Sequence, residues 1–439
     1  MLYSYIGLQT ALLATYFPKV YWNTACLRVD AGLEEEASTN YDKISKAVGN
    51  MIYRGIDVKT VDINKSKYMF EPDEEHNSIL FGLKGITSAN GEFIRDVVAN
   101  RPYASPQDFL NRMNPSKTMM INLIKAGAFD EFDNRQTLMK SYLRETSGQK
   151  KRITLQNFNG LQNAGLIPES LAFEQRVWNY NKALKKYMKY DKQYYKLEGN
   201  FYTFYHENFD EDFIRVVNGT PCIDKKTWKT IYDSQMVVVK DYFKEHEQEL
   251  LTALNDSLLQ EEYEKYALGS ISTWEMESLG YYSHKHELAN VNKGLYNIVP
   301  YSTLPDDPAT DYIIQNKGRE IPIFKTFRIV GTVVGKNIVK SQINILTPDS
   351  GVVIVKMSRD YFARYNRRIS SLDETGVNRV REEGWFKRGN LVMVNGFKRG
   401  GMFVTKTYKN TPSHQLYLIT GVNDKDGSMS FTNKRWGEE

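Results

Sequence analysis

Two lysine–glycine turns, each preceded by an apolar run, are the residues of this chain best suited to holding a phosphate. The first turn lies in LFGLKGITSAN (80–90) and the second in LIKAGAFDEF (123–132). A glycine turn that leads into a helix directs backbone N–H groups outward at the helix N-terminus, where an anion can bind. Two such turns would grip one DNA duplex at two phosphates without reading its sequence. The predicted duplex contacts are Lys84, Gly85, Ile86, Thr87, Lys125, Ala126 and Gly127. The structural alternative is that both glycines only cap helices.

A second set of candidate residues lies in the last quarter of the chain, where basic and aromatic side chains alternate along expected strands. The segment GFKRGGMF (396–403) places two positive charges and two rings around a glycine tip. Single-stranded nucleic acid is held by rings that stack on bases and cations that contact the backbone. The predicted single-strand contacts are Phe327, Arg328, Lys356, Phe397, Lys398, Arg399 and Phe403. The alternative is a basic surface hairpin whose rings close the end of a barrel.

Metal ligands are sparse by comparison. Asp210 and Asp212 lie on one face of an expected strand in a charged segment, which is typical of solvated surface. His284 and His286 are separated by one residue and have no third ligand nearby. The two cysteines, Cys26 and Cys222, imply neither a disulfide framework nor a metal site. We expect no metal and no cofactor in this chain, and an independent nuclease lacks a credible cluster of carboxylates or histidines.

Periodicity indicates which elements carry these residues. Helical patterns cover residues 1–30, interrupted by Pro18, and recur up to Gly127. Residues 146–300 are charged and tyrosine-rich with helical periods, and Lys182, Lys185, Lys186, Lys189 and Lys192 share one broad face there. Residues 321–420 change to strands joined by glycine turns, with a helical stretch after the third strand. That order predicts an OB-fold, a small closed barrel of five strands and one helix. The fold class is therefore multidomain α+β, helical first and barrel-like last.

Bulk properties set wide limits. The 439 residues suggest two to four domains, and a net charge of +5 is compatible with nucleic acid without being evidence for it. No apolar run reaches the length of a membrane helix, so we expect no membrane partner. A reducing cytoplasm is the expected location.

Several segments occur in a recognisable order: VDINKSKYMF (61–70) is followed by FGLKGI, RPYASPQDFLNRM and LIKAGAFDEFDNRQTL. The first resembles the segment D-I-N-x-S-x-x-x-F of bacterial and phage replicative DNA polymerase III alpha subunits of the DnaE type, and the others follow in that family's order. The resemblance implies the cytoplasm of a bacterium or of a phage-infected bacterium. EMESLGYYSHKHEL (275–288) resembles E-x-E-x-L-G-x-Y-x-S-x-H-P-L, with Glu287 in place of the proline. Thr87 stands where the first hairpin of the family has its second glycine. The resemblance covers residues 1–145, 275–288 and, more loosely, the barrel.

The resemblance implies a map of the chain. Residues 1–75 correspond to the distal fingers, 76–145 to a tandem helix–hairpin–helix module and 320–422 to an OB domain near the template. Residues 146–300 are an expanded insertion or linker, and 423–439 a flexible tail. The family's catalytic aspartates, which bind Mg²⁺, lie in a palm domain upstream of the fingers. We therefore expect a DNA-binding portion of a split polymerase that works only with a separate palm- and thumb-bearing fragment.

The resemblance also raises the sliding clamp as a partner. The string QLYLI (415–419) resembles a clamp-binding peptide, but we expect it to be a barrel strand that cannot leave its domain. The alternative function is a stand-alone accessory protein that binds single-stranded or duplex DNA. The apolar helix at residues 1–30 favours the polymerase, because an autonomous DNA-binding protein has little use for it.

Overall fold

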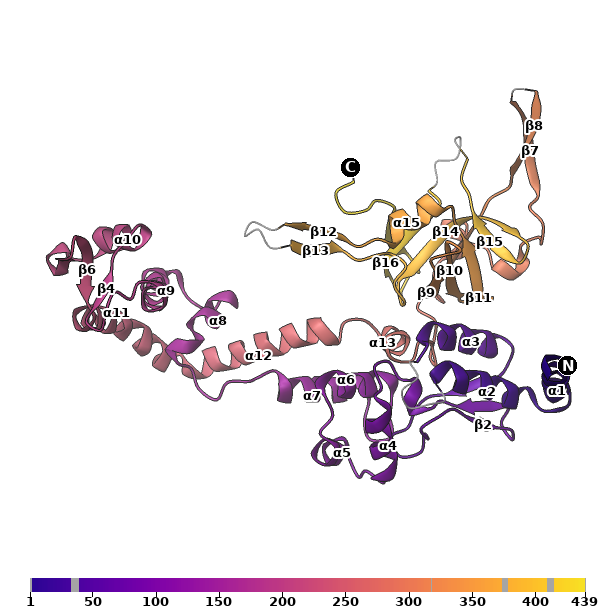
Figure 1. Cartoon of the computed structure of the whole chain (residues 1–439), viewed down its shortest axis with the longest axis horizontal. Helices are drawn as coiled ribbons and strands as arrows, with labels where there is room; N and C mark the ends of the chain where they lie inside the picture. Colours follow the sequence, from indigo (N-terminus) through magenta and orange to yellow (C-terminus); the bar gives the residue numbers. More distant parts are fainter. Residues whose placement is uncertain (1, 33–38, 317, 373–377, 409–413, 439) are drawn as a thin grey trace. The chain divides into compact units, whose positions relative to one another are not determined.

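The computed structural model describes residues 2–32, 39–316, 318–372, 378–408 and 414–438 (Figure 1). The chain forms two compact units, one of Met1–Met139 with Gly269–Glu439 and the other of Lys140–Leu268. The sequence placed the boundaries of the middle segment at 146 and 300. The difference arises because residues 269–300 pack with the first unit.

The first unit begins with helices and a small sheet. The helices are α1 (Leu2–Tyr16), α2 (Lys19–Ala31) and α3 (Tyr41–Tyr53), and the strands β1 (Asp57–Lys59), β2 (Glu71–Asp73) and β3 (Ser78–Leu80) form a sheet of order β1-β3-β2. Pro18 precedes α2 and separates it from α1, as the sequence predicts. Many side chains of α1 are exposed although they are apolar, among them Leu8, Leu12 and Leu13.

The two expected hairpins follow this sheet. Their elements are η1 (Leu83–Gly85), α4 (Gly91–Ala99), α5 (Pro106–Met113), α6 (Lys117–Ala126) and α7 (Arg135–Thr146). Asn90, Ser105 and Ser116 cap α4, α5 and α6 through their side-chain oxygens, which accept hydrogen bonds from backbone N–H groups of the first turn. The short helix η1 carries the first lysine–glycine turn, and the end of α6 carries the second.

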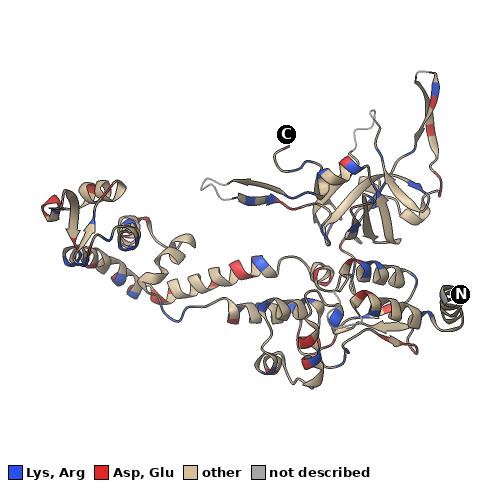
Figure 2. Ribbon diagram, in the orientation of Figure 1, with Lys and Arg blue, Asp and Glu red and all other residues tan. Residues whose placement is uncertain are grey.

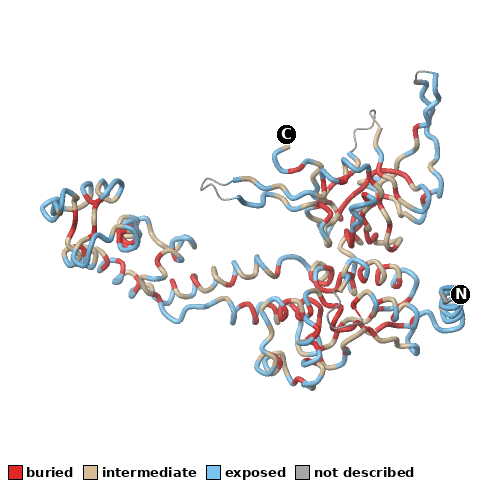
Figure 3. Tube along the Cα trace, in the orientation of Figure 1, coloured by how far each residue is buried: buried red, intermediate tan, exposed pale blue. Residues whose placement is uncertain are grey.

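The last part of the first unit is a closed five-stranded barrel, which confirms the predicted OB-like fold. Around the barrel the strands run β9 (Phe327–Asn337), β10 (Gln342–Thr347), β11 (Gly351–Lys356), β15 (Met402–Thr405) and β14 (Leu391–Arg399), and β14 pairs with β9 to close the ring. The helix α15 (Arg359–Asn366) follows the third barrel strand, as predicted. Buried positions alternate along β11 and along the first half of β10, so one face of each strand fills the barrel. Figure 3 shows many buried positions in the strands of this barrel.

The predicted strand at 415–419 exists but lies outside the closed ring. β16 (Leu416–Val422) pairs with β14, and β17 (Met429–Thr432) pairs with β16. β15 closes the barrel instead, because it pairs with β11 on one side and with β14 on the other. The segment predicted as a flexible tail contains β17, whose Met429 joins a buried apolar cluster with Tyr417 and Ile419.

The outer face of the barrel is partly covered by α3. A side chain at Gly49 of α3 would lie 2.8 Å from Val352 and 2.9 Å from Leu346, which shows how closely the helix approaches β10 and β11. Leu346 also packs with Tyr282, Met276 and Val334 in a common cluster. The helical part and the barrel of the first unit therefore share apolar contacts.

The remaining elements of the first unit connect these parts or extend from the barrel. They are α13 (Ile271–Ser278), α14 (Lys293–Tyr296), η5 (Tyr301–Thr303), the hairpin β7 (Thr310–Asn316) with β8 (Arg319–Phe324), and the hairpin β12 (Ile369–Leu372) with β13 (Asn378–Glu382).

The second unit is helical, as predicted, but it also holds a small sheet. The strand expected at Asp210 and Asp212 is not part of that sheet, because Glu211–Phe213 form a 3-10 helix there. The helices of this unit are η2 (Leu155–Asn157), α8 (Phe158–Asn163), η3 (Glu169–Leu171), α9 (Ala172–Tyr187), α10 (Asn200–Asn208), η4 (Glu211–Phe213), α11 (Lys225–Glu245) and α12 (Glu247–Tyr266). The strands β4 (Tyr194–Lys196), β5 (Ile214–Val217) and β6 (Thr220–Asp224) form a sheet of order β4-β6-β5. Its aromatic core includes Phe158, Trp178, Tyr205 and Trp228.

Across the described ranges, none of the helices has the length and apolar character needed to cross a bilayer.

Candidate nucleic-acid interface

The first lysine–glycine turn is folded against the protein. Lys84 is 6% exposed, and a side chain at Gly85 would lie 2.7 Å from the rings of Phe70 and Phe81. Gly85 N–H donates to the carbonyl of Gly82, and Ile86 N–H donates to that of Leu83. The glycine thus makes room for aromatic rings, and these two amides are already bonded within the turn.

Thr87 anchors the first turn to the end of α13. Its backbone N–H donates to the Ser278 carbonyl at 2.8 Å, and its hydroxyl donates to the Glu277 carbonyl at 2.8 Å. Arg388, which precedes β14, donates from Nη2 to the same hydroxyl at 2.9 Å. The side chain that replaces the family's second glycine therefore serves as an internal contact in this structure.

The second turn is a left-handed helix cap. Gly127 has φ of +84°, and its N–H donates to the Ile124 carbonyl. A side chain there would lie 2.6 Å from the Asp130 carboxylate and would also meet the Arg135 guanidinium. Lys125 is 7% exposed, and its Nζ lies 2.5 Å from Glu277 Oε2, while Ala126 is fully buried. Gly127 therefore has the geometry of a helix cap, whereas Gly85 lies inside η1 and makes room for the rings of Phe70 and Phe81.

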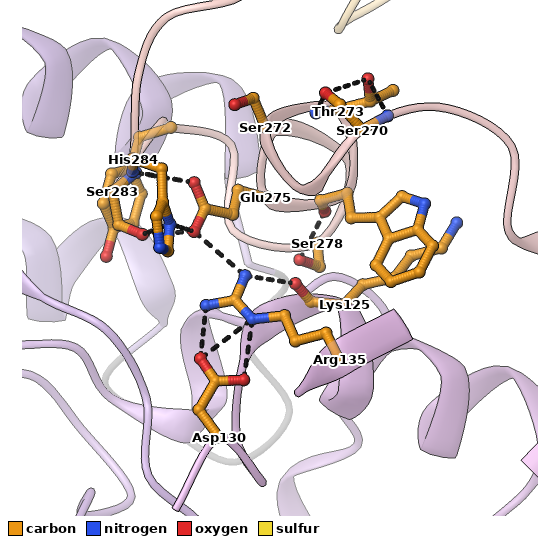
Figure 4. A network of polar contacts seen from close by, with 12 residues as sticks. Lys125, Asp130, Arg135, Ser270, Ser272, Thr273, Glu275, Ser278, Ser283 and His284 are labelled. Atoms are coloured by element: carbon orange, nitrogen blue, oxygen red, sulfur yellow. Dashed lines mark hydrogen bonds and ion pairs between the residues drawn. The ribbon is translucent and has the colours of Figure 1, made fainter. Parts of the chain in front are cut away.

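A buried polar network joins the second turn to α13 (Figure 4). Arg135 Nη1 donates to Glu275 Oε1 at 3.0 Å and to the Lys125 carbonyl at 3.1 Å, and its Nε and Nη2 donate to Asp130. Glu275 is fully buried and also accepts from the backbone N–H groups of Ser283 and His284. Burial works against the charge of Arg135, but its hydrogen bonds and ion pairs keep the pKa above the ordinary value.

This network brings two motifs that are far apart in the sequence into contact in the folded chain. Asp130 and Arg135 belong to the segment after Gly127, whereas Glu275 and Ser283 belong to the segment 275–288. Their order was visible in the sequence, but the pairing between the segments was not. A buried carboxylate needs a cation and several hydrogen-bond donors. The opposite charges of Arg135 and Glu275 in the two motifs were therefore the signal that could have indicated the contact between the two segments.

In the barrel, most of the predicted single-strand contacts are held inside the structure. Phe403 is fully buried in the barrel core and Phe397 is 6% exposed, so neither ring has a free face for a base. Arg328 donates to the Asn395 side chain and to the Tyr296 carbonyl. Lys398 Nζ lies 2.5 Å from Asp306, and this hydrogen bond raises the lysine pKa.

The other three predicted contacts are more accessible. Phe327 is half-buried, with Lys325 Nζ 5.6 Å from its ring centroid. Lys356 is also half-buried, and its Nζ donates to the Lys340 carbonyl. Arg399 is exposed at the start of the turn between β14 and β15.

Two turns bring basic side chains together at one end of the barrel. Lys336 lies near the end of β9, Lys340 lies in the β9–β10 turn, and the β14–β15 turn begins after Arg399. Gln342, just after the first turn, contacts Met402, just after the second, with 3.1 Å between Nε2 and Sδ. We call Lys336, Lys340, Lys356 and Arg399 the barrel-tip surface. Sequence reasoning missed its two β9–β10 lysines because they do not lie beside a ring.

Exposed apolar side chains flank this surface. Ile338 is 65% exposed and Val339 is 95% exposed at the tip of the β9–β10 turn. Strands 2 and 3 of an OB-fold and the loops at this end form its usual site for oligonucleotides. Because α3 covers part of that sheet face, the barrel tip is the accessible portion of the site.

Among the residues that the structure describes, no group of three or more His, Cys, Asp or Glu side chains could hold a metal ion. His284 instead contacts Glu275, with Nδ1 2.6 Å from Oε1. His286 Nε2 lies 3.0 Å from the Leu346 carbonyl, while Nδ1 accepts from Leu288 N–H at the same distance. Asp210 caps η4 by accepting from Asp212 N–H.

Comparisons with known proteins agree with this architecture. A helix-hairpin-helix motif family matches residues 55–138, the part of the chain that carries both turns. The class of protein is therefore one with a helix–hairpin–helix module joined to an OB-like barrel.

Relatives extend the comparison over nearly the whole chain. The chain is 38% identical, over 99% of its length, to "Probable DNA polymerase YorL" of Bacillus subtilis and to "DNA-directed DNA polymerase" of Bacillus phage SPbeta. It spans 34% of each of these proteins. It is also 30% identical to the Thermus aquaticus DNA polymerase III subunit alpha over 146 residues, which are 32% of this chain and 11% of that subunit. The predicted resemblance is confirmed: the chain is similar over nearly its whole length to a segment of these two DNA polymerases, and over about a third of its length to polymerase III alpha subunits.

Proposed function

We propose that this chain is a DNA-binding portion of a replicative DNA polymerase of this family. The observation that carries the proposal is the 38% identity to DNA polymerases over nearly the whole chain. In this proposal the helix–hairpin–helix module holds the duplex product and the barrel-tip surface holds the single-stranded template. The exposed cations at the barrel tip support the second assignment, because DNA affinity comes largely from phosphate neutralisation.

Duplex contact in this proposal comes from side chains and not from the turn amides. The amides of Gly85, Ile86, Thr87 and Gly127 are bonded within the protein, and Lys125 is paired with Glu277. Charge reversal at Lys125 would therefore disrupt the packing of the hairpin, and any loss of DNA binding could follow from that disruption. The barrel tip offers a cleaner experiment, because Lys340 and Arg399 are exposed.

The binding test uses anisotropy of a labelled single-stranded oligonucleotide over a range of salt. Charge reversal of Lys340 and Arg399 together should weaken binding about tenfold or more, and the salt slope should fall by about 0.7 for each lost phosphate contact. The matched control reverses Lys425 and Lys434, which are exposed in the β16–β17 region. Equal affinities for the two variants would remove the barrel tip from the proposal.

Nucleotide transfer, in this proposal, depends on a separate palm- and thumb-bearing part of the polymerase, where Mg²⁺ is bound. The exposed apolar helix α1 supports this dependence, with Leu8, Leu12 and Leu13 at 59%, 46% and 52% exposure. Such a surface on a soluble domain usually marks an interaction site. We therefore propose α1 as the contact for the palm-bearing part.

Primer extension tests this dependence. The purified chain should not extend a primer alone, and extension should appear when the palm-bearing polypeptide is added with Mg²⁺. The Leu8→Asp, Leu12→Asp variant should lose the reconstituted extension while keeping its DNA affinity. Magnesium-dependent extension by the isolated chain would refute the dependence. A sliding clamp remains an expected partner of the assembled polymerase, to be tested by adding clamp to the same assay.

A further inference from the structure

The second unit carries a dense group of lysines that the proposed function does not use. They lie on the last turns of α9, on the segment that follows it and on the first turns of α11, where Figure 2 shows several blue positions. Residues 182–192 and 224–233 contain eight lysines and three aspartates. The lysines, which we call the lysine face, are Lys182, Lys185, Lys186, Lys189, Lys192, Lys225, Lys226 and Lys229.

Contacts between the two helices make this one continuous surface. Trp228 of α11 donates from Nε1 to the Asn181 side chain of α9 at 3.1 Å. Lys185 Nζ lies 5.5 Å from the ring centroid of Tyr232 on α11. Lys225 Nζ donates to the backbone carbonyl of Lys192 at 3.2 Å. The start of α11 therefore borders both α9 and the chain that leaves it.

The charges of the lysine face are not balanced locally. Two of the nearby aspartates serve as caps: Asp191 accepts from the N–H groups of Gln193 and Tyr194, and Asp224 accepts from those of the first turn of α11. Within the described part of this unit, no carboxylate forms an ion pair with Lys182, Lys185 or Lys186. Seven of the eight lysines are exposed, and Lys225 is half-buried. Like charges gathered in this way repel one another, and a polyanion would relieve that repulsion.

Exposed rings stand beside these lysines. Tyr187 is 59% exposed, and Lys186 Nζ lies 4.7 Å from its ring centroid. Tyr190 is 36% exposed, and its hydroxyl accepts a hydrogen bond from the Asn218 side chain at 3.2 Å. Rings interleaved with cations are typical of surfaces that bind unpaired bases, since each ring can stack on any base.

Spacing along α9 suits a strand. Lys182 and Lys186 are one helical turn apart, about 6 Å along the axis, so one extended strand can present consecutive phosphates to both. We propose that the lysine face of the second unit is a second DNA site, which binds single-stranded DNA through its phosphates and stacks bases on Tyr187 and Tyr190. The inference rests on the proposed function in one respect, which is that the polyanion bound by this chain is DNA.

The test uses the full chain and labelled oligothymidylates, with anisotropy measured over a range of salt. The Lys182→Glu, Lys186→Glu variant should bind at least about tenfold more weakly, with a salt slope smaller by about 1.4. The matched control is Lys240→Glu, Lys244→Glu, which reverses two exposed lysines at the same spacing on α11. This control should stay within about twofold of the unchanged chain. Equal weakening in both variants would overturn the proposal.

A second variant separates stacking from charge. Tyr187→Ala should weaken binding about fivefold or more without changing the salt slope, because it removes a ring and no cation. A blunt duplex should show less dependence on Tyr187 than oligothymidylate does. Equal dependence on both would overturn the single-strand assignment. Circular dichroism confirms that each variant is folded.

The outcome also distinguishes this site from the barrel tip. If reversal of Lys340 and Arg399 weakens binding and reversal of Lys182 and Lys186 does not, the inference fails and the barrel-tip proposal stands. If only the second reversal weakens binding, the lysine face stands and the barrel tip fails. Additive loss in the combined variant is the expected result, because the two surfaces belong to different units.

Discussion

Replacing Arg135 with methionine should release the second hairpin from α13. The side chain of Arg135 is 3% exposed and that of its partner Glu275 is fully buried, and their closest atoms lie 3.0 Å apart. Removing the cation leaves a buried carboxylate with only the donors of Ser283 and His284, and loss of one partner of a buried pair typically costs about 3–5 kcal/mol. The Ser283 and His284 N–H groups still donate to Glu275, so we expect the lower end, about 3 kcal/mol.

An exposed ion pair of the same length provides the control. Lys65 Nζ lies 3.0 Å from Glu131 Oε1, but the two side chains are 69% and 53% exposed. Water screens this pair, so Lys65→Met should cost less than about 1 kcal/mol. The two substitutions thus compare equal distances at different burial.

Amide hydrogen exchange measured on peptides from α6 and α13 is the assay, because the chain has two units and a single unfolding transition is not assured. A loss of about 3 kcal/mol should speed exchange in these helices by about two orders of magnitude. Peptides from α9 in the second unit should be unchanged. If Arg135→Met changes exchange in α6 and α13 no more than Lys65→Met does, the network does not stabilise the hairpin and the reasoning fails.

Three further predictions follow from single residues. Burial lowers the pKa of His286 from 6.5 to about 4. The contribution of neutral His286 to folding stability is therefore complete above about pH 6.5 and is lost as the pH falls toward 4. Between about pH 7 and 5 the folded first unit should lose about 2 kcal/mol of stability, measured as faster amide exchange in β10, and His286→Gln should abolish this pH-dependent loss. Gly127→Ala should destabilise the second hairpin by about 1–3 kcal/mol, because φ is positive and the new methyl group meets Asp130. Unchanged amide exchange in peptides from α6 would contradict this. Lys398→Ala should leave single-strand affinity within about twofold in the anisotropy assay, because the Nζ of Lys398 is already ion-paired with Asp306. A larger loss of affinity would show that Lys398 contacts the single strand.

Local signals in the sequence located many of the elements. Ser105 before Pro106 and Gly127 after Ala126 mark the start of α5 and the end of α6, because capping chemistry acts over only a few residues. The switch from helical to strand periods near residue 320 identified the barrel and its helix after the third strand. The small sheet in the second unit was missed because its strands have only three to five residues and lie between strong helical patterns.

The direction of side chains was harder to predict. Phe403 and Lys398 are neighbours across the β14–β15 pair, and the composition of the hairpin does not show which face turns inward. In the structure the ring of Phe403 fills the barrel, and its strand neighbour Met402 points toward the tip beside Gln342. A one-residue shift in register reverses this choice, so the sequence alone left the faces of these residues undecided.

The motif residues that carry the family resemblance are largely occupied with one another. Asp130, Arg135 and Glu275 form one network in which Arg135 and Glu275 are buried, and the two glycine turns make room for rings or for a guanidinium. Cations that are already paired with carboxylates in this packing attract a phosphate only weakly. The cations proposed here to contact DNA lie instead at the barrel tip and on the lysine face, outside those motifs. DNA affinity should therefore respond most to substitutions at these two surfaces, whereas substitutions in the motifs should act first on the stability of the module that presents them.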